Sequence, residues 1–179
     1  MIKRKEMEDL FAQHGYQDFR WIDAKNIVVA QWVRTKCMFA CKTYGKKATC
    51  PPNTPPVAEC REFFAGYDRA VIFRFEHAVD PPEARFAWCR EKNTELLKLE
   101  RKVFLRGYYK AFLFFMDECS LCTDCARVLE KCVYRELSRP CPESFAVDVF
   151  ATVRSVGYPL EVLTDYTQKM NRYAFLMIE

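Results

Sequence analysis

Several features that would mark whole classes of protein are missing from this chain of 179 residues. No apolar run is long enough to cross a bilayer, and the charged residues 1–10 lack the apolar stretch of a signal peptide. The chain has only five glycines, and it contains neither a glycine-rich phosphate loop nor the nucleophile motif Gly-x-Ser-x-Gly. We therefore expect a cytoplasmic protein without a membrane partner, and no P-loop or α/β-hydrolase site is indicated.

The net charge of the chain is also small. Its 28 basic and 24 acidic residues leave +4, which is too little to indicate a nucleic-acid partner. Positive charge is dense in one segment, at Arg34, Lys36, Lys42, Lys46 and Lys47. This segment is a solvated loop, or it compensates a negatively charged centre or forms a docking face for an acidic partner.

Cysteine, by contrast, is abundant, with ten residues. An even number suggests disulfides, but the chain has no sign of secretion, and clustered cysteines in a reducing compartment are typical of metal sites. Cys119, Cys122 and Cys125 form a Cys-x2-Cys-x2-Cys run, and Cys132 and Cys141 follow, the latter before a proline. In the ferredoxin-type pattern, three cysteines at this spacing precede a more distant Cys-Pro. The run therefore favours an iron–sulfur cluster.

A second group of cysteines lies earlier in the chain. Together the two groups predict one or two [4Fe–4S] clusters, with zinc as the alternative metal. Four-cysteine zinc sites usually combine two Cys-x2-Cys pairs, whereas here one group is a triple and the other has no such pair. A thioredoxin-like redox pair needs no third cysteine and fits less well. The candidate metal ligands of both groups are Cys37, Cys41, Cys50, Cys119, Cys122, Cys125, Cys132 and Cys141.

The spacing leaves open which cysteines share a centre. If residues 126–137 form a helix, Cys125 and Cys132 lie about 10 Å apart along its axis, at about 1.5 Å per residue. That is a long reach for two ligands of one cluster. Cys132 or Cys141 could then complete the earlier group. Alternatively, the earlier group has only three thiolates and leaves one iron site open.

The periodicity of the apolar residues predicts an α+β fold. We expect a small mixed sheet covered by helices, with two cysteine-rich metal-binding loops, in a single metal-binding domain over residues 1–179. Cys60 and Cys89 lie on apolar helix faces, where a lone cysteine is usually a core residue. The predicted helices cover 3–13, 55–65, 82–105, 126–137 and 149–156, the predicted strands cover 16–22, 27–33, 70–75, 109–116 and 173–178, and a loop is expected over 34–56.

Three motifs carry a resemblance to a known family. A lysine–cysteine loop over 36–52 ends in Cys-Pro-Pro, and a Cys-x2-Cys-x2-Cys-x6-Cys run occupies 119–132. Residues 139–149 are close to Arg-Pro-Ser-x-Glu-Ala-x-Gly-Ile-Asp-Val, from which Cys141, Pro142 and Ala146 depart. The three motifs resemble a prokaryotic family of unknown function, the predicted metal-binding proteins. The resemblance implies metal binding by seven cysteines, because Cys141 stands where the family pattern has serine.

These motifs predict a metal-binding protein that transfers electrons or acts as a redox accessory to a partner protein. The sequence contains no recognisable nucleophile–base pair, so we expect a carrier more than an enzyme. Two alternatives stay open. One is a zinc-stabilised interaction module, and the other is an iron–sulfur enzyme with an open iron site at Cys37, Cys41 and Cys50.

Overall fold

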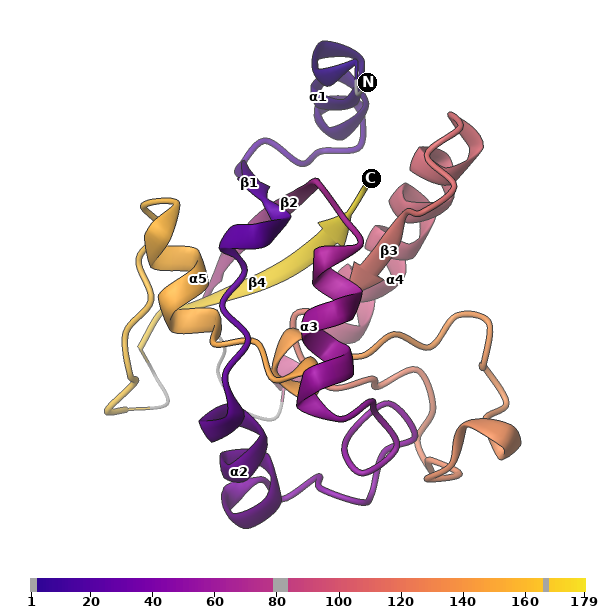
Figure 1. Cartoon of the computed structure of the whole chain (residues 1–179), viewed down its shortest axis with the longest axis vertical. Helices are drawn as coiled ribbons and strands as arrows, with labels where there is room; N and C mark the ends of the chain where they lie inside the picture. Colours follow the sequence, from indigo (N-terminus) through magenta and orange to yellow (C-terminus); the bar gives the residue numbers. More distant parts are fainter. Residues whose placement is uncertain (1–2, 79–83, 166–167) are drawn as a thin grey trace.

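The centre of the fold is a four-stranded sheet in which every neighbouring pair of strands is antiparallel (Figure 1). The computed structural model describes residues 3–78, 84–165 and 168–179. The expected α+β fold is confirmed, with an antiparallel sheet in place of the mixed sheet. In their order across the sheet, the strands are β1 (Phe19–Asp23), β2 (Arg69–His77), β4 (Met170–Met177) and β3 (Phe112–Phe114).

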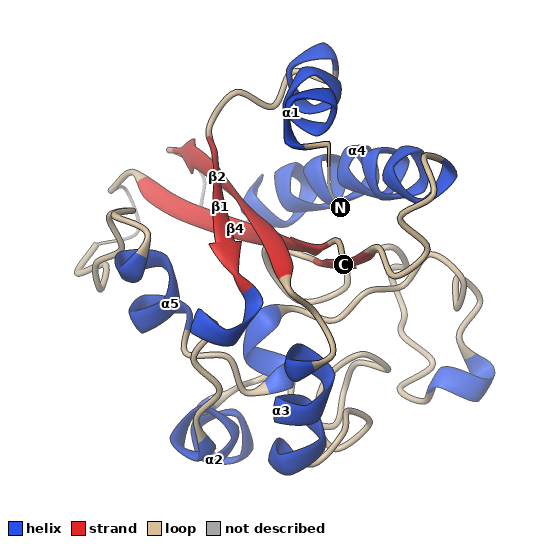
Figure 2. Cartoon of the chain, turned by 45° about the horizontal axis from the view of Figure 1, so that its top comes forward, coloured by secondary structure: helices blue, strands red, loops and turns tan. Residues whose placement is uncertain are grey.

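Helices cover both faces of this sheet (Figure 2). They are α1 (Arg4–Gln13), α2 (Gln31–Ala40), α3 (Val57–Ala65), α4 (Ala84–Leu105) and α5 (Val149–Ser155), with short 3₁₀ turns η1 (Ala24–Asn26), η2 (Leu129–Lys131) and η3 (Pro142–Phe145). Helices α1 and α4 lie on one face, and α3 and α5 lie on the other. Helix α2 lies beyond the sheet, beside the loop that joins it to α3.

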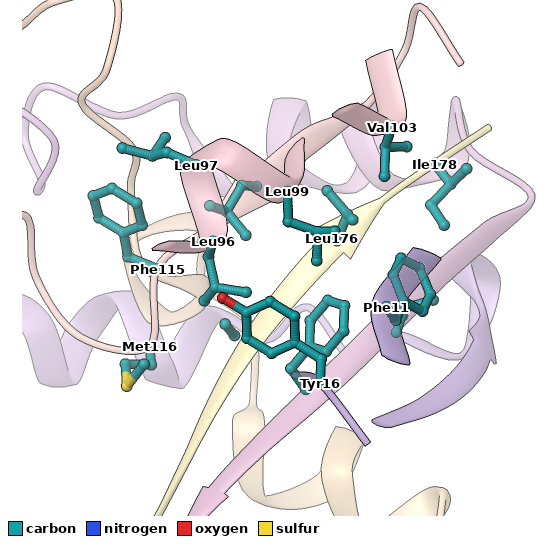
Figure 3. Packing of buried hydrophobic residues seen from close by; sticks show 14 of the residues in the cluster. Phe11, Tyr16, Leu96, Leu97, Leu99, Val103, Phe115, Met116, Leu176 and Ile178 are labelled. Carbon is teal, nitrogen blue, oxygen red and sulfur yellow. The ribbon is translucent and has the colours of Figure 1, made fainter. Parts of the chain in front are cut away.

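The alternation of side chains along the strands creates two cores. In β2, Val71 and Phe73 point toward α1 and α4, whereas Ala70 and Ile72 point toward α3 and α5. Successive residues of a strand face opposite sides, so a continuous run of buried residues fills both layers. Figure 3 shows the first core, where side chains of α1, α4 and β4 meet.

Buried polar side chains of α4 bind both ends of the second cysteine loop, which joins β3 to η3 and carries Cys119, Cys122, Cys125 and Cys132. The Glu100 carboxylate accepts a hydrogen bond from Leu113 N–H at 2.8 Å, and Asn93 Oδ1 accepts one from Met116 N–H at 3.2 Å. Glu100 also binds the Arg139 guanidinium, with three nitrogen–oxygen distances of 3.0, 3.1 and 2.9 Å. The strand that enters the loop and the residue that leaves it are therefore both fixed to one helix.

The strand predicted at 27–33 is wrong. The first part of this segment is extended, and Val29 forms an isolated bridge with Val147. The chain then becomes helical at the start of α2, which also replaces the first part of the loop predicted at 34–56. The β-branched run Ile27-Val28-Val29 favoured a strand locally. Strand β1 pairs with β2, and the segment 27–33 contributes no strand to the sheet.

The helix predicted at 126–137 is also wrong, because these residues form an irregular loop around η2. The residues of its apolar stripe stay outside both cores, since Val128, Leu129 and Cys132 are half-buried and Leu137 is 50% exposed. A short helix in a protein gains most of its stability from packing of its apolar face. Arg127 also has a left-handed φ of 68°, which interrupts helical geometry near the expected start.

The other elements occur close to their predicted positions. The helix expected at 82–105 is α4, although its first two residues lie outside the described part of the chain. The strand expected at 109–116 is shortened to β3. Asp148 caps α5, since its carboxylate accepts a hydrogen bond from a backbone N–H at 2.9 Å. Cys60 and Cys89 lie in the two cores, as their positions on apolar helix faces predicted.

Candidate metal centre

Helix α2 presents the first two cysteines of the earlier group. Cys37 lies on this helix, and Cys41 directly follows its last residue. A spacing of four residues brings both side chains to one face of a helix, so this spacing was a helical signal that the strand and loop predictions did not use. Cys50 lies in the loop between α2 and α3 and is buried.

Cys141 joins these three cysteines, although it lies far from them in the sequence. A pocket of about 350 Å³ is lined by Cys37, Cys41, Cys50 and Cys141 together. The Cys37 thiol donates to the backbone carbonyl of Glu143 at 3.8 Å, which links α2 to the turn η3 that follows Cys141. The structure thus brings four of the eight candidate thiols to one pocket, and their role as ligands stays a prediction.

Arg34 links three segments around this pocket through hydrogen bonds. Its Nη2 donates to the carbonyl oxygens of Pro55 at 3.0 Å and Ser144 at 2.9 Å. Ala30 N–H, at the start of α2, donates to the carbonyl of Ala146 at 2.9 Å. Arg34 therefore joins α2, the segment before α3 and η3. Its role is structural, whereas Lys36, Lys42 and Lys46, with which the sequence had grouped it, are exposed.

Burial raises the pKa of three thiols of the pocket, those of Cys37, Cys50 and Cys141. It raises the pKa of Cys50 to about 12, and the nearby Glu118 carboxylate adds to the rise. Burial also raises the pKa of the Cys37 thiol, and it raises that of Cys141 well above its usual value. A buried thiol ionises readily only where positive charge compensates it, and a metal bound in the pocket would supply that charge.

Three carboxylates that the sequence prediction overlooked line the same pocket, namely those of Asp117, Glu118 and Glu143. The available signal was their position, since Asp117 and Glu118 directly precede Cys119, and Glu143 lies two residues after Cys141. Burial raises the pKa of Glu118 to about 7, and a hydrogen bond with Asp117 and the charge of that residue contribute. One wall of the thiol pocket is therefore acidic.

The other four cysteines lie in the irregular loop between β3 and η3, which is orange in Figure 1. Burial raises the pKa of Cys119, and the nearby Cys122 and Cys132 thiols contribute. Burial also raises the pKa of Cys122, and Cys125 and Cys132 contribute there. All four side chains are half-buried. The eight candidates therefore divide into four in the pocket and four on this loop.

The two cysteine loops lie side by side at one end of the molecule (Figure 1). Ala48 N–H, on the first loop, donates to Cys125 Sγ on the second at 3.3 Å. Asn53 Nδ2 donates both to the carbonyl of Lys47 at 3.2 Å and to that of Arg127 at 2.6 Å. These contacts hold the two sets of thiols next to each other.

Among the described residues, no three His, Cys, Asp or Glu side chains are gathered closely enough to hold a single metal ion as they stand. The case for a metal centre rests on the donor set, which is four thiols around one pocket and four on the adjoining loop. Thiolates are soft ligands that suit zinc, copper(I) and iron–sulfur clusters. The fold thus gathers a thiol-rich donor set of the kind that metal-binding proteins use.

Comparison with known families agrees with this class. The family described as "Predicted metal-binding protein (DUF2284)" matches residues 20–178, and the chain belongs to this family. The search of curated proteins and the search of solved structures returned no match. In the part of the chain that the structure describes, no helix has both the length and the apolar character that spanning a membrane requires.

The backbone explains one feature of the segment that resembles the family pattern. Ala146 stands at the glycine position of that pattern, and its φ of 60° lies in the left-handed region, where a side chain is strained. The Ala146 carbonyl accepts the hydrogen bond from Ala30. The turn that carries Cys141 therefore uses a conformation suited to glycine at the point where it joins α2.

Proposed function

We propose that this protein holds two [4Fe–4S] clusters and transfers electrons to a partner protein. The observation that supports the proposal is the division of eight cysteines into four that line one pocket and four on the adjoining loop. The pocket cysteines would hold one cluster, and the cysteines between 119 and 132 would hold the other. Such clusters supply one-electron chemistry, and four thiolates complete their ligation by the protein.

Two features favour clusters over zinc. A zinc ion in a four-cysteine site lies about 2.3 Å from each sulfur, so its ligands enclose little space. The four thiols of the first set are instead spread over the lining of a pocket of about 350 Å³, which suits a larger centre. In the second set, Cys119, Cys122 and Cys125 recur at three-residue steps, as in ferredoxin-type loops. A zinc-stabilised interaction module accounts for neither feature.

The position of Cys141 favours a carrier over an enzyme. An open iron site would require that the earlier group has only three thiols, whereas four line the pocket. A cluster ligated by four thiolates has no free position for a substrate. Electron transfer needs only that the cluster lies near the surface, and the exposed Cys41 marks an edge of the pocket that solvent and a partner can reach.

A reducing compartment suits this function, and we place the protein in the cytoplasm. All ten cysteines are free thiols. Cluster ligation needs the cysteines in their reduced state, whereas oxidising compartments favour disulfides. Clustered thiols such as these would be prone to pair with one another outside a reducing environment.

Analysis of metal and sulfide tests the proposed function. Protein purified without oxygen should be brown and should contain about eight iron and about eight sulfide per chain, the content of two [4Fe–4S] clusters. Zinc without sulfide would contradict the proposal, and a chelator should then unfold the chain. About four iron per chain would mean a single cluster, and the division into two sets would be wrong.

A basic and apolar surface beside the first pocket suits an acidic partner. No acidic residue occurs between residues 24 and 58, which include α2 and the loop after it. Exposed apolar side chains among positive charges are typical of protein-binding surfaces, and complementary charge speeds association. The α2 surface is defined by Trp32, Met38 and Phe39, which are 51, 46 and 84% exposed, and by the exposed Lys42 and Lys46.

Reversing the charge of the α2 surface should slow electron transfer from an acidic donor. A reduced flavodoxin, which is a small acidic protein, serves as the probe in stopped-flow measurements at low salt. The variant Lys42→Glu/Lys46→Glu should react about tenfold more slowly, because steering by complementary charge is worth at least this factor. The difference should shrink at high salt.

The matched control for this experiment is Lys98→Glu/Lys102→Glu on α4, which makes the same change in net charge on another helix. Its rate should stay close to that of the wild type. Iron and sulfide content, measured first, should be equal in all three proteins, so that a slower rate cannot result from a lost cluster. Equal slowing by both double variants would mean that the partner responds to net charge and not to the α2 surface.

A further inference from the structure

A turn over residues 47–50 of the first cysteine loop, between α2 and α3, contacts the second cysteine loop. Cys50 N–H donates to the Lys47 carbonyl at 3.2 Å and closes this turn, in which Ala48 is the second residue. The Ala48 N–H donates to Cys125 Sγ on the second loop at 3.3 Å. Ala48 is only 2% exposed, so its N–H is shielded from water. A backbone donor of one loop therefore reaches a candidate ligand of the other.

The side chain of Asn53 holds this turn in place. Its Nδ2 donates to the Lys47 carbonyl, at the start of the turn, at 3.2 Å, and to the Arg127 carbonyl, on the second loop, at 2.6 Å. The Asn53 N–H donates to the Cys50 carbonyl, at the end of the turn, at 3.0 Å. Both ends of the turn are thus bound to one residue that is itself bound to the second loop. The hydrogen bond between the loops is therefore supported by its neighbours.

Lys47 brings a positive charge from the same turn to the second set of cysteines. The residue is half-buried, whereas Lys42 and Lys46 are exposed. Burial raises the pKa of the Cys122 thiol and of the Glu118 carboxyl, and the charge of Lys47 opposes both rises. Solvent and salt screen a half-buried charge less than an exposed one. Lys47 therefore stabilises negative charge at the second set.

Both features favour the reduced form of the second cluster, which the cysteines between 119 and 132 would hold. A donor protein that reduces this cluster gives it one electron, and no bond forms or breaks. A hydrogen bond to a charged acceptor is stronger than one to a neutral acceptor, so an N–H that donates to a ligating sulfur gains strength when the electron arrives. The potentials of iron–sulfur clusters depend on such hydrogen bonds and on net charge. A donor and a cation at this set should therefore raise its potential.

We propose that the Ala48 N–H and the charge of Lys47, both on the first loop, raise the reduction potential of the second cluster. This inference rests on the proposed function, and it identifies the part of the chain that sets the potential at which one of the two clusters accepts an electron. The same turn ends at Cys50, a candidate ligand of the other cluster. One loop would thus bind one cluster and adjust the potential of its neighbour.

A redox titration with dithionite, followed by electron paramagnetic resonance, tests this proposal on the full chain. The signal of the second cluster is the one that remains in Cys141→Ala. Ala48→Pro should lower the midpoint potential of this signal by about 59 mV, a tenfold change in a one-electron equilibrium, because proline has no N–H to donate. Proline is favoured at the second position of a turn, so the backbone should accept it. Ala48→Gly keeps the N–H and should leave the potential unchanged.

A second pair of variants changes the charge without altering the backbone. Lys47→Gln should lower the same potential by a smaller amount, because the charge is partly screened. Lys46→Gln makes the same change in net charge at an exposed position and should leave the potential close to that of the wild type. Iron and sulfide are measured first in every variant, and this pair gives the answer if Ala48→Pro loses a cluster.

The possible outcomes separate this inference from the proposed function. An unchanged potential in iron-loaded Ala48→Pro, or an equal shift in Ala48→Gly, would overturn the role of the Ala48 N–H. Equal shifts in Lys47→Gln and Lys46→Gln would show a response to net charge alone and would overturn the role of Lys47. Two cluster signals whose potentials ignore all these changes would refute this inference and leave the proposed function intact. A wild-type protein without either signal would contradict the proposed function itself.

Discussion

Replacing Cys141 by alanine should halve the iron content of the protein, from about eight to about four atoms per chain. Cys141 lines the first pocket with Cys37, Cys41 and Cys50, so its loss leaves that cluster with three thiolates. The second set lies on a separate loop and should keep its cluster. Iron and sulfide analysis after anaerobic purification measures the loss, and an electron paramagnetic resonance spectrum of the reduced protein should show one cluster signal in place of two.

Matched variants separate the possible outcomes of this experiment. Cys50→Ala should behave like Cys141→Ala, Cys122→Ala should remove the other cluster, and Cys89→Ala, in the core, should keep all the iron. If Cys141→Ala keeps all its iron while Cys50→Ala loses half, Cys141 is not a ligand. That result would favour an open iron site at Cys37, Cys41 and Cys50. Loss of both clusters in Cys50→Ala would mean that the two loops share one centre.

Replacing Glu100 by alanine should lower the free energy of unfolding by about 3–5 kcal/mol, the usual cost of breaking a buried ion pair. The Glu100 side chain is 7% exposed and that of its partner Arg139 is 19% exposed. The change leaves this guanidinium without its carboxylate and Leu113 N–H without its acceptor. Because a domain has about 5–15 kcal/mol of stability in total, the variant should be close to unfolding. Urea denaturation followed by circular dichroism measures the change.

Two further variants show whether the buried pair is responsible for this loss. Glu100→Gln keeps an oxygen acceptor for Leu113 N–H and should cost less, about 1–3 kcal/mol. Glu6→Ala breaks the exposed pair with Lys3 and should have little effect. The loss in Glu100→Ala should persist at high salt, since screening acts mainly on exposed charges. A loss no larger than that of Glu6→Ala would mean that Glu100 does not hold the second cysteine loop in place.

Local sequence was sufficient to predict a helix or strand where that element packs its apolar residues in the two cores. The helices predicted at 3–13 and 82–105 carry apolar residues at helical spacing, and the strand predicted at 70–75 carries a continuous apolar run that fills both layers. A pattern of this kind records the surface that the element must bury, so it can be recognised without knowledge of the partner element. The cap at Asp148 is equally local, because its hydrogen bond spans only three residues.

Local sequence gave the wrong secondary structure where contacts between distant segments determine the backbone conformation. The β-branched residues 27–29 favoured a strand, but α2 is held in place by Arg34 and by the contact between Ala30 and Ala146. The apolar stripe at 126–137 predicted a helix, but none of its residues enters either core, and they stay half-buried or exposed. In both places the local preference is weak compared with the tertiary contacts that are gained or missing.

The sequence by itself determined which donors the candidate site offers, because the count and spacing of cysteines identify a soft, thiol-rich set without reference to the fold. It also identified the family. Only the tertiary structure decided how the thiols are grouped and placed Cys141 beside Cys37, Cys41 and Cys50. The physical reason is that residue type sets donor chemistry locally, whereas grouping and burial depend on contacts between segments that are far apart in the chain.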